Sequence, residues 1–444
     1  MSDDPDAFRF YVPRRVSNPS TARFLFATGI ECSYPVISTP EGDLRRDQMR
    51  ECGHYDRWRE DLDLVAETGC RVLRYGPPYY LIHLGPDRYD WSLTDEVLPE
   101  MRNRGIAPII DLCHFGVPDW IGDFQNPEFP ELFCTYARAF AERYPWIRLY
   151  TPVNEMYITA EFSAYYGWWN ERLKSHRGFV TAVKNITRAS LEAMLAILQV
   201  RSDALFILCE SSEHTHANHP ELVRKAQMFN ERRYLTLDLT VGRRVNSGMY
   251  VYLMDNGMTN EEYTYFLRQD LREHFIIGHD YYVTNEHLLI DDEVRHGSGE
   301  IFGYYALAKA YHERYHLPIM HTETNERDER SVEWLWKTWA NIQLLRHGGV
   351  PVCGMTWYSL TDQIDWDTAL RENNGRVHSV GLYDLDRKQR RVGRAYKRLI
   401  EQWRDTPLLP HGPLTLVGNV LPEDLIWAAG EEPAGEVTPK RVQR

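Results

Sequence analysis

Two stretches far apart in the chain place a glutamate just after a short apolar run. The run Ile147–Val153 leads to Asn154 and Glu155, and the run Leu317–Met320 leads to Glu323. A buried strand that delivers a polar side chain at its carboxyl end has this pattern. Two carboxylates facing one cavity are what the cleavage of a glycosidic bond requires, because one acts as acid and base and the other as nucleophile or second base. The pair therefore predicts a sugar-cleaving site.

The elements that must position these glutamates are eight short apolar runs separated by helical stretches. Such alternation is typical of βα units around a parallel sheet. We expect strands at Arg23–Gly29, Cys70–Tyr75, Ile106–Cys113, Ile147–Val153, Ala204–Cys209, Phe275–Tyr282, Leu317–Thr322 and Cys353–Ser359. Glu155 then follows the fourth strand and Glu323 the seventh, and these strands lie on opposite sides of an eight-stranded barrel. We predict an α/β fold, a (β/α)8 TIM barrel with enlarged βα loops.

Helical stretches fill most intervals between the predicted strands. We expect helices at Trp58–Thr68, Leu93–Arg104, Pro130–Tyr144, Phe179–Val200, Phe302–Tyr315, Ser331–His347 and Arg394–Trp403. The interval 210–274 is unusually long, and an insertion at the carboxyl end of a strand builds a wall over the site below it. The chain has no G-x-G-x-x-G motif and no phosphate-binding loop, which counts against a nucleotide-binding sheet.

The length of 444 residues suits a single barrel with enlarged loops. We divide the chain into an N-terminal arm (1–20), the barrel (21–404) and an irregular C-terminal tail (405–444) rich in Pro, Gly and Glu. The formal net charge of -13 argues against a nucleic acid or an anionic membrane as partner. We find neither a signal peptide nor the run of about 18 apolar residues that spans a membrane.

The seven cysteines are odd in number and widely spaced, and none forms a C-x-x-C pair. Several lie inside apolar runs, where cysteine behaves as a small hydrophobe. This usage favours reduced, buried thiols in a cytoplasmic protein.

Both glutamates belong to a longer series of motifs between about Phe24 and Trp403. The stretches are Arg74–Gly76, Cys113–Pro118, Thr151–Glu155, Gly278–Tyr282, His321–Asn325, Trp357–Trp366 and Ser379–Asp386. In this order they resemble the R-F-S, Y-H-W-x-x-P, T-[FL]-N-E-P, G-I-N-Y-Y, I-T-E-N-G, W-S-L-x-D-N-F-E-W and R-F-G-L-x-x-V-D motifs of glycoside hydrolase family 1. This is the β-glucosidase and β-galactosidase family, whose members are retaining enzymes on (β/α)8 barrels.

The resemblance implies a role for each matching residue. Glu155 would be the general acid and base. Glu323 would be the nucleophile, kept ionised by a cation such as Arg74 and oriented by the Tyr282 hydroxyl. Asn154 would bind the sugar 2-hydroxyl. Further sugar contacts are implied for His114, Asp280, Trp357, Asp365 and Trp366, with the Trp357 ring as a platform.

Three positions depart from the family's pattern. Where members carry the Gln of S-x-Y-Q-x-E-G after the first strand, this chain has the stretch Glu31–Pro35 without a Gln. The sugar-binding Glu of F-E-W is Asp365, one methylene shorter, and Asp280 replaces an Asn near the nucleophile. We therefore expect the reaction type to be retained and the sugar-recognition residues to differ.

Two polar clusters in the 210–274 interval can each be interpreted as functional or as merely structural. His214, His216 and His219 have types that bind metals, but no acidic or Cys ligand recurs at a fixed spacing, so a solvated loop is favoured. Arg232 and Arg233 suit an anionic substrate group, yet such a charge run is more often a solvated helix face, which we favour.

The prediction is a metal-independent, cofactor-free retaining β-glycosidase that takes a small β-glycoside. One alternative is transglycosylation, in which an acceptor hydroxyl replaces water. A second is a non-hydrolytic sugar-binding barrel, which the missing Gln favours and the presence of both glutamates opposes. A third is a barrel aldolase or metal-dependent hydrolase, but no predicted strand ends in the Lys or ligand cluster that these need. The identity of the sugar and the oligomeric state stay open.

Overall fold

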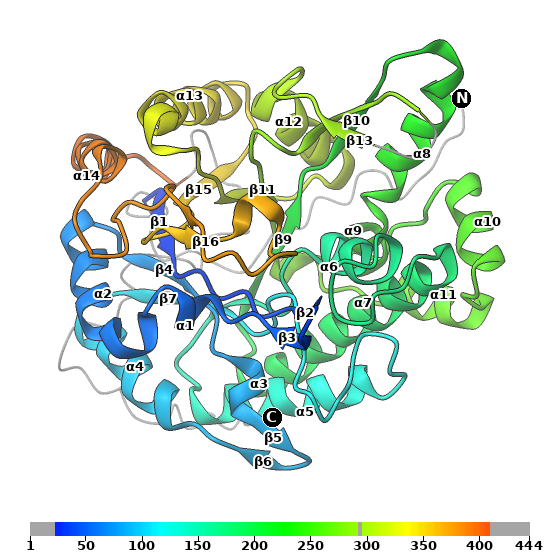
Figure 1. Ribbon diagram of the computed structural model, residues 1–444, viewed down its shortest axis with the longest axis horizontal. Helices are drawn as coiled ribbons and strands as arrows, with labels where there is room; N and C mark the ends of the chain where they lie inside the picture. Colours follow the sequence, from blue (N-terminus) through cyan, green and yellow to red (C-terminus); the bar gives the residue numbers. More distant parts are fainter. Residues whose placement is uncertain (1–22, 292–294, 409–444) are drawn as a thin grey trace, which may run out of the picture.

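The computed structural model describes residues 23–291 and 295–408. In these residues eight parallel strands close into a barrel and follow one another around it in chain order (Figure 1). The strands are β1 (Leu25–Gly29), β4 (Val72–Tyr75), β7 (Ala107–Asp111), β8 (Leu149–Thr151), β9 (Leu205–Ser211), β11 (Phe275–Asp280), β14 (Ile319–Glu323) and β15 (Val352–Trp357). The eight predicted strands and the (β/α)8 fold are confirmed. The predicted arm lies outside the described residues, as does the predicted tail beyond 408.

The helices surround the barrel and cover its outer face (Figure 1). Those that connect successive strands or follow the last one are α2 (His54–Thr68), α4 (Ser92–Asn103), α5 (Phe129–Arg143), α7 (His176–Val200), α12 (Gly303–Tyr315), α13 (Asp328–His347) and α14 (Arg391–Trp403). All seven predicted helices are confirmed. In the two described ranges, none of the helices combines the length and the apolar character that crossing a membrane requires.

The interval 210–274 contains helices that the sequence patterns did not predict. They are α8 (Val223–Arg232), α9 (Leu235–Thr240), α10 (Ser247–Asp255) and α11 (Asn260–Leu267). Each is short, and α8 carries charged residues that obscure its apolar face. Helices of fewer than about ten residues give a weak periodic signal, because they span under three turns.

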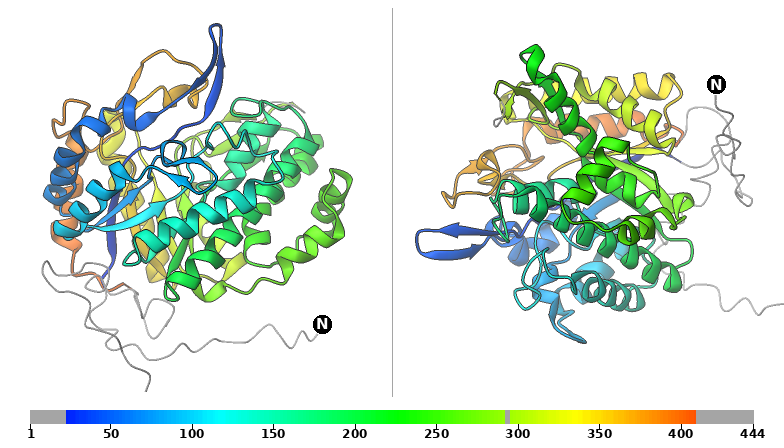
Figure 2. Two further views of the ribbon diagram at one scale, coloured as in Figure 1. Left: turned by 90° about the horizontal axis from the view of Figure 1, so that it is seen from below. Right: turned by 90° about the vertical axis from the view of Figure 1, so that its right-hand side faces the viewer.

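Shorter elements decorate the ends of the barrel. Antiparallel pairs form from β2 (Val36–Thr39) with β3 (Gly42–Arg45), β5 (His83–Gly85) with β6 (Arg88–Tyr89), and β16 (Gln363–Ile364) with β17 (Val377–His378). The β2–β3 hairpin projects from the body of the molecule (Figure 2). A three-stranded sheet joins β10 (His214–Ala217), β12 (Glu286–Leu289) and β13 (Arg295–Gly297).

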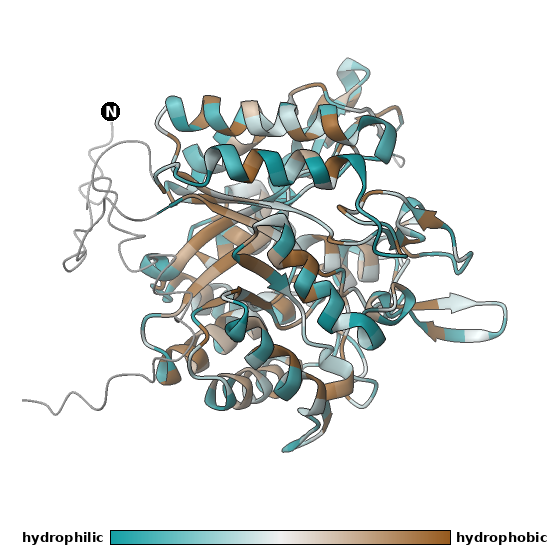
Figure 3. Ribbon diagram, turned by 90° about the vertical axis from the view of Figure 1, so that its left-hand side faces the viewer, coloured by the Kyte–Doolittle hydropathy of each residue, from teal (hydrophilic) through white to brown (hydrophobic). Residues whose placement is uncertain are grey.

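The barrel interior is packed with alternate residues of the strands. An apolar cluster fills it, separate from the larger one between strands and helices, and consists of Leu25, Ala27, Val72, Ala107, Ile109, Leu149, Leu205, Ile207, Cys209, Ile276, Met320, Cys353 and Leu408. The strands are accordingly the most apolar elements (Figure 3). Two residues further along the same strands, Val72 gives way to Arg74 and Ile109 to Asp111. The period of two therefore carries the core directly into a polar layer at the carboxyl ends.

A shift of register in β14 changes which residue reaches this polar layer. β11 and β14 pair in regular steps up to His279 and His321, and then Asp280 pairs with Glu323 instead of Thr322. Regular alternation from Met320 would send Thr322 inward and Glu323 outward. Irregularities of this kind re-aim a side chain next to a site. Glu323 owes its place inside the barrel mouth to the shift.

All seven cysteines are free thiols. Six are buried and Cys134 is half-buried. The prediction of burial is confirmed for those six, and their reduced state stays a prediction. Cys209 and Cys353 pack as small apolar side chains in the barrel interior, whereas the Cys32 thiol contacts a histidine.

Gly278 stands inside the barrel, where two strands approach closely. A Cβ atom at this position would lie 2.7 Å from the Cα atom of Cys209 and 2.9 Å from the Thr322 hydroxyl oxygen. A backbone atom of a central strand does not move aside without disturbing its pairing. Glycine at this position therefore reflects a lack of room.

We expect Gly278→Ala to lower the free energy of unfolding by about 1–3 kcal/mol, because an extra methyl overpacks the interior. The measurement is the denaturant midpoint. Gly297→Ala is the matched control, since a Cβ there meets nothing within 4 Å. Equal midpoints for the two variants would contradict the close approach.

Candidate active site

A cavity of about 720 Å³ opens at the carboxyl ends of the strands. This is the end at which (β/α)8 barrels place their sites, and the volume suits a ligand of small-molecule size. Its lining includes Glu155, Glu323, Tyr282, His114 and Trp366. Five residues predicted from separate motifs thus line one cavity.

Glu323 ends β14 and is held from two sides. The Arg74 guanidinium on β4 forms an ion pair with one carboxylate oxygen, and the Tyr282 hydroxyl donates to the other at 2.7 Å. The carboxylate is 6% exposed. A cation and a hydroxyl donor both stabilise the ionised form of a carboxylate. The arrangement orients Glu323 as an anion toward the cavity.

Glu155 lies in a different environment. Its backbone has φ 37° and ψ 62°, in the left-handed region that a non-glycine residue adopts at a cost, and the helix α6 (Met156–Ala160) follows at once. Its N–H donates to the carbonyl oxygen of Cys209 at 3.0 Å, which ties the strained residue to β9. Burial raises the pKa of Glu155 well above its usual value, and the negative charge of Glu323 raises it further.

The two glutamates lie close together with a third carboxylate beside them. One oxygen each from Glu155, Asp280 and Glu323 lies within 4.8 Å of the other two. Asp280 ends β11 and is fully buried. Glu323 is therefore paired with a cation, whereas Glu155 is buried beside two further carboxyl groups. Environments that differ in this way assign different protonation states to two carboxyl groups of one site.

Arg74 also organises the floor of the cavity. Its second terminal nitrogen donates to Asp111 at 2.8 Å and to the side-chain oxygen of Asn154. Asp111 in turn accepts from Nδ1 of His114 at 2.7 Å, while the Asn154 amide nitrogen lies 3.1 Å from Nε2 of His114. Since the Asn154 oxygen accepts from Arg74, its nitrogen must be the donor to His114. The ring of His114 is thereby fixed at both nitrogens.

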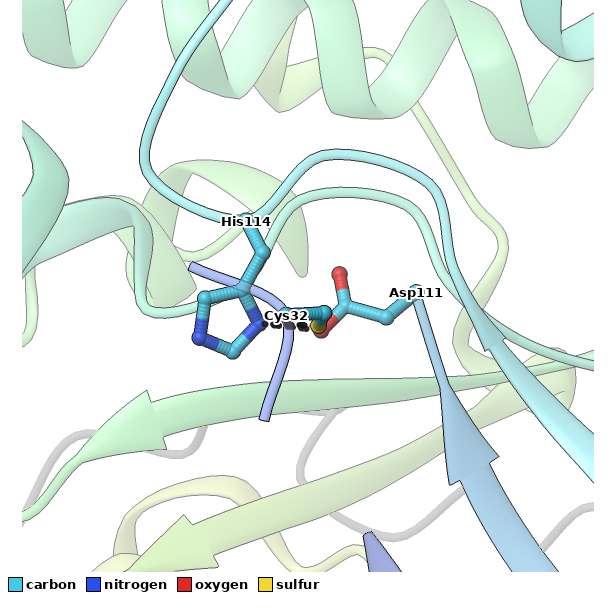
Figure 4. Close-up of side chains that lie close together, drawn as sticks. All are labelled: Cys32, Asp111 and His114. Atoms are coloured by element: carbon cyan, nitrogen blue, oxygen red, sulfur yellow. Dashed lines mark hydrogen bonds and ion pairs between the residues drawn. The ribbon is translucent and has the colours of Figure 1, made fainter. Parts of the chain in front are cut away.

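Cys32 completes this network from the chain after β1. Its thiol lies 3.4 Å from Nδ1 of His114, on the same side as Asp111 (Figure 4). Cys32 is distant in the sequence from Asp111 and His114, which lie three residues apart, and the fold brings its thiol to the His114 ring. The contacts with Cys32 and Asp111 fix the position of the His114 ring in the cavity wall.

Two groups of side chains have types and spacing that suit a metal ion. They are Cys32 with Asp111 and His114, and the three carboxylates Glu155, Asp280 and Glu323. Arg74 contacts a carboxylate of each group, Asp111 in one and Glu323 in the other. A guanidinium already neutralises the charge that a metal would need, so the residues present fit a metal poorly.

Four of the predicted sugar-binding residues are not among those that line the cavity, namely Asn154, Asp280, Trp357 and Asp365, and their roles stay predictions. Trp357 is fully buried, and its indole N–H donates to the carbonyl oxygen of Val380 at 2.9 Å. Asp365 is fully buried as well and pairs with Arg46 at 3.1 Å. It also accepts from the backbone N–H groups of residues 374, 375 and 376. Neither residue belongs to the cavity lining, because each is used to hold a loop.

Two of the residues that line the cavity were not singled out by the motifs. Glu31, in the segment after β1, is 2% exposed and lines the cavity together with Gln363. The Gln363 amide donates to its carboxylate at 2.9 Å, and the N–H of Ser33 donates to its other oxygen at 2.9 Å. Glu31 follows a barrel strand, as Glu155 and Glu323 do. That position was the signal in the sequence that would have found it.

Trp366 has a feature that suits binding. It lines the cavity, and its buried indole nitrogen has no hydrogen-bond partner in the described residues. A buried N–H without a partner is costly, and a ligand that accepts from it removes the cost. Trp366 therefore offers a donor to a ligand in this cavity.

The outer wall beside Glu155 is aromatic. Phe162, Tyr166 and Trp168 line it, with the Tyr166 and Trp168 rings stacked at 4.7 Å. The Arg371 guanidinium lies 4.3 Å from the centre of the Trp168 ring and joins the loop after β15 to the loop after β8. These rings supply an apolar surface where the floor supplies charge.

The three-stranded sheet adds a charged wall. Glu213 accepts from Ser211 at 3.0 Å, from Asn285 at 2.7 Å and from His287, and Arg295 lies beyond it. Burial by itself would raise the pKa of Glu213, but His287, Arg295 and Asn285 outweigh it and lower the pKa to about 2. Glu213 is therefore a fixed anion in this wall.

The prediction of a solvated helix face at Arg232 and Arg233 was wrong. Arg232 is fully buried and pairs with Glu161 at 2.6 Å, while Arg233 is 4% exposed and donates to the Tyr234 hydroxyl at 2.6 Å. Charged residues enter the interior here because each finds a partner. Neither lines the cavity, so neither contacts a substrate directly.

His214 and His216 both lie on β10, with ring centres 4.6 Å apart. His214 contacts Arg233 at 2.9 Å, and His216 contacts Glu286 at 2.8 Å. The metal groupings found in the described residues do not include them. The prediction of a solvated loop holds for His219, which is exposed, and fails for the other two, which are half-buried.

Comparisons with known proteins agree with this geometry. The sequence profile of glycosyl hydrolase family 1 matches residues 41–285, which is 245 of the 444 residues. Beta-glucosidase A of Thermotoga maritima is 22% identical over 160 residues, 34% of this chain and 36% of that protein. The 6-phospho-beta-glucosidase AscB of Escherichia coli is 29% identical over 114 residues, 23% of this chain and 24% of that protein. The matches thus span well under half the length of these curated relatives.

Solved structures match over a longer range. The beta-glucosidase from Thermotoga maritima in complex with glucoimidazole has a TM-score of 0.72 at 17% identity and covers 87% of this chain and 100% of that chain. The same enzyme in complex with azafagomine has a TM-score of 0.70 at 17% identity and covers 86% and 98%. At this identity the likeness shows the fold.

Fold and site together define a (β/α)8-barrel protein with paired carboxylates at the carboxyl end of its barrel. Since the family profile matches more than half of its residues, the chain belongs to glycosyl hydrolase family 1.

We expect the stability contributed by Glu213 to depend on pH. Its pKa is lowered on folding, so the contribution is present above the unfolded value of about 4.3 and is lost as the pH falls toward about 2. Glu213→Gln should therefore lower the melting temperature at pH 6 and by less at pH 3. Glu41→Gln, on an exposed residue, is the control. A melting-temperature difference that stays constant between these pH values would contradict the pairing.

Proposed function

We propose that the protein is a retaining β-glycosidase, with Glu155 as acid and base and Glu323 as nucleophile. The observation that carries the proposal is the short separation of the two carboxylates, with oxygens within 4.8 Å of each other in unlike environments. Retaining enzymes have carboxyl groups about 5–5.5 Å apart, whereas inverting enzymes leave about 6.5–9.5 Å for a water molecule. The names of the relatives in the family support β-glucosides as the first substrates to test.

In the first step the Glu323 carboxylate attacks the anomeric carbon. The bond to the leaving group breaks as Glu155 gives its proton to the glycosidic oxygen, and a glycosyl ester forms on Glu323. Arg74 and Tyr282 hold the attacking carboxylate in position before the reaction, so little reorganisation is needed. The buried surroundings of Glu155 keep its proton available near neutral pH.

In the second step Glu155, now ionised, takes a proton from a water molecule. That water attacks the anomeric carbon from the side that the leaving group has vacated, and the Glu323 ester breaks. Two inversions give net retention of the β configuration. The proton returned to Glu155 restores the starting state.

Four side chains would recognise the sugar. Trp366, with its unpartnered indole N–H, offers a donor to its hydroxyls, while the His114 ring, whose nitrogens are held by Asp111 and Asn154, forms part of the wall beside them. Glu31 and Gln363 form a buried acceptor and donor pair in the wall that also contains His114. Asn154 touches His114 and remains the candidate for the 2-hydroxyl. Carboxylate and amide groups side by side suit a pair of neighbouring hydroxyls.

The leaving group would lie against Phe162, Tyr166 and Trp168. These rings follow Glu155 in the chain, so the acid and the aromatic wall are placed together. Aromatic faces accept both aryl groups and the apolar faces of sugars. Small aryl or alkyl β-glycosides and disaccharides fit this description and the volume of the cavity.

Transglycosylation uses the same two glutamates, with an acceptor hydroxyl in place of water. The aromatic wall favours it as the second candidate, because a bound acceptor there would exclude water from the ester. A sugar-binding barrel without catalysis is the third, and the Arg74–Glu323 pair weighs against it. Such a buried pair is hard to explain in a protein that only binds neutral sugars.

We expect both catalytic glutamates to be essential in different ways on a panel of nitrophenyl α- and β-glycosides. Glu323→Gln should lower kcat on the best β-glycoside on the order of 10⁴–10⁶-fold, because it removes the nucleophile. Glu155→Gln should lower it about 10²–10⁴-fold for alkyl leaving groups. With a dinitrophenyl leaving group, which departs without a proton, ester formation by this variant should be nearly normal. Glu221→Gln, on an exposed residue, is the control.

Three results would redirect the proposal. Unchanged turnover in Glu323→Gln would show that the catalytic assignment is wrong. Sugar binding by calorimetry without turnover of any glycoside would favour the binding protein. Methyl glycoside formed in excess over free sugar in dilute methanol would favour the transglycosidase. Proton NMR of the first product, with a β anomer expected, tests retention directly.

We expect Glu31→Ala to lower kcat/KM about 10–100-fold, chiefly through KM, because a hydrogen bond to a charged group contributes about 1.5–3 kcal/mol. The test pairs the variant with deoxy analogues of the preferred sugar. For the analogue that lacks the hydroxyl bound by Glu31, the variant and the wild type should react alike. A loss of equal size with every analogue would show that Glu31 supports the fold instead.

A further inference from the structure

Asp280 is a buried carboxylic acid whose function the two-glutamate reaction does not explain. It is fully buried at the end of β11, two residues beyond Gly278 on the inward-facing side of the strand. In the described residues neither of its oxygens makes a hydrogen bond of good geometry, and the neighbouring Thr322 hydroxyl is itself without a partner. A buried carboxylate without a partner is among the costliest groups in a protein interior.

The charges around Asp280 make ionisation more costly still. One of its oxygens lies within 4.8 Å of carboxylate oxygens of both Glu155 and Glu323. Glu210 on β9 adds a further acid, and the Cys209 thiol and the Tyr282 hydroxyl face it as well. Among the described residues, the cation with the largest effect on it is Arg74 on β4.

Arg74 is already engaged with other carboxylates. It forms ion pairs with Glu323 and Asp111 and also donates to Asn154. One guanidinium thus neutralises two acids that contact it directly, while Asp280 has no contact with it. The floor of the cavity contains more acids than cations, and burial prevents water from making up the difference.

We propose that Asp280 is a neutral, protonated carboxylic acid throughout the pH range in which the site works, and that it acts as a positioning residue for the two glutamates. This inference rests on the proposed function of Glu155 and Glu323. Burial and the charge of Glu323 raise the pKa of Asp280 well above its usual value, which agrees with the geometry.

A proton on Asp280 has two consequences for the site. With Asp280 neutral, Glu323 is the only one of the three carboxyl groups that must be ionised for the attack. The positive charge of Arg74 therefore acts on the nucleophile. The proton on Asp280 also leaves Glu155 as the group that exchanges a proton with the substrate, because Asp280 does not line the cavity. A protonated carboxyl has the shape of a carboxamide and, like it, combines a donor with an acceptor, although it donates one hydrogen where the amide donates two. The Asp at this position is therefore chemically closer to Asn than its usual charge suggests.

The experiment compares pH profiles of kcat/KM for the wild type and Asp280→Asn. The two limbs report the free-enzyme pKa values of the nucleophile and of the acid. If Asp280 is neutral, exchanging it for a neutral amide moves neither limb to lower pH by more than about 0.5 units. If Asp280 is ionised, the exchange removes a negative charge beside both glutamates, and the limbs move to lower pH by about one unit or more. The second result would overturn the proposal.

A second measurement does not require catalysis. A carboxyl whose pKa is raised on folding stabilises the fold fully at low pH and loses that contribution as the pH rises from about 4 toward its folded pKa. The melting temperature of Asp280→Asn relative to the wild type should therefore increase between pH 4 and pH 8. A constant difference would overturn the proposal even if no glycoside is turned over. Asp280→Ser, also neutral, provides the same comparison if the amide variant folds poorly.

Discussion

The candidate site depends on one buried guanidinium. Arg74 lies near the carboxyl end of β4 and reaches Glu323 on β14, Asp111 on β7 and Asn154 after β8, so a single side chain connects four of the segments that carry the site. Removing one partner from a buried ion pair costs about 3–5 kcal/mol, because the other charge is then left without compensation. The orientation of His114 follows from the same contacts, since Asp111 and Asn154 hold its two ring nitrogens. The position of Arg74 therefore fixes the positions of Glu323 and of the His114 ring.

The distribution of charge in the cavity separates its floor from its walls. The floor combines a fixed cation with an excess of buried acids, and the outer wall near Glu155 consists of aromatic rings. Low dielectric surroundings strengthen both the attraction at Glu323 and the repulsion at Glu155. Two residues of the same type therefore behave differently only because of what surrounds them. The left-handed backbone at Glu155 shows that the chain accepts local strain to keep this placement.

The barrel was predictable because its strands are apolar on both faces and its glutamates follow strands directly. Each apolar run ends close to the end of its strand, so the sequence placed Glu155 and Glu323 at the carboxyl ends of strands, although period-two alternation would have pointed Glu323 outward. Asp365 was not, because it lies in a loop and has a left-handed backbone (φ 54°) that turns its side chain toward Arg46. Gln363 and Glu31 line the cavity wall, where Asp365 was expected. In loops the direction of a side chain depends on backbone dihedrals, which spacing in the sequence does not encode.

Burial of charged residues was also beyond the reach of the sequence patterns. In the sequence, Arg232 and Arg233 resemble residues on the exposed face of a helix. Only the folded structure shows that Arg232 pairs with Glu161 and that Arg233 donates to Tyr234. The register shift in β14 is similar, since a strand of alternating residues gives no sign that its last residue has changed sides. In each of these cases the placement of a side chain depends on the tertiary fold, which the local sequence pattern does not encode.

The small sheet of β10, β12 and β13 is structurally separate from the barrel. Its strands come from the connections after β9 and β11, outside the closed ring of eight, and they pair with one another and not with the barrel. Changes in this sheet can therefore alter the rim of the cavity without breaking a barrel hydrogen bond. The rim of the cavity and the barrel beneath it are carried by separate hydrogen-bonded sheets.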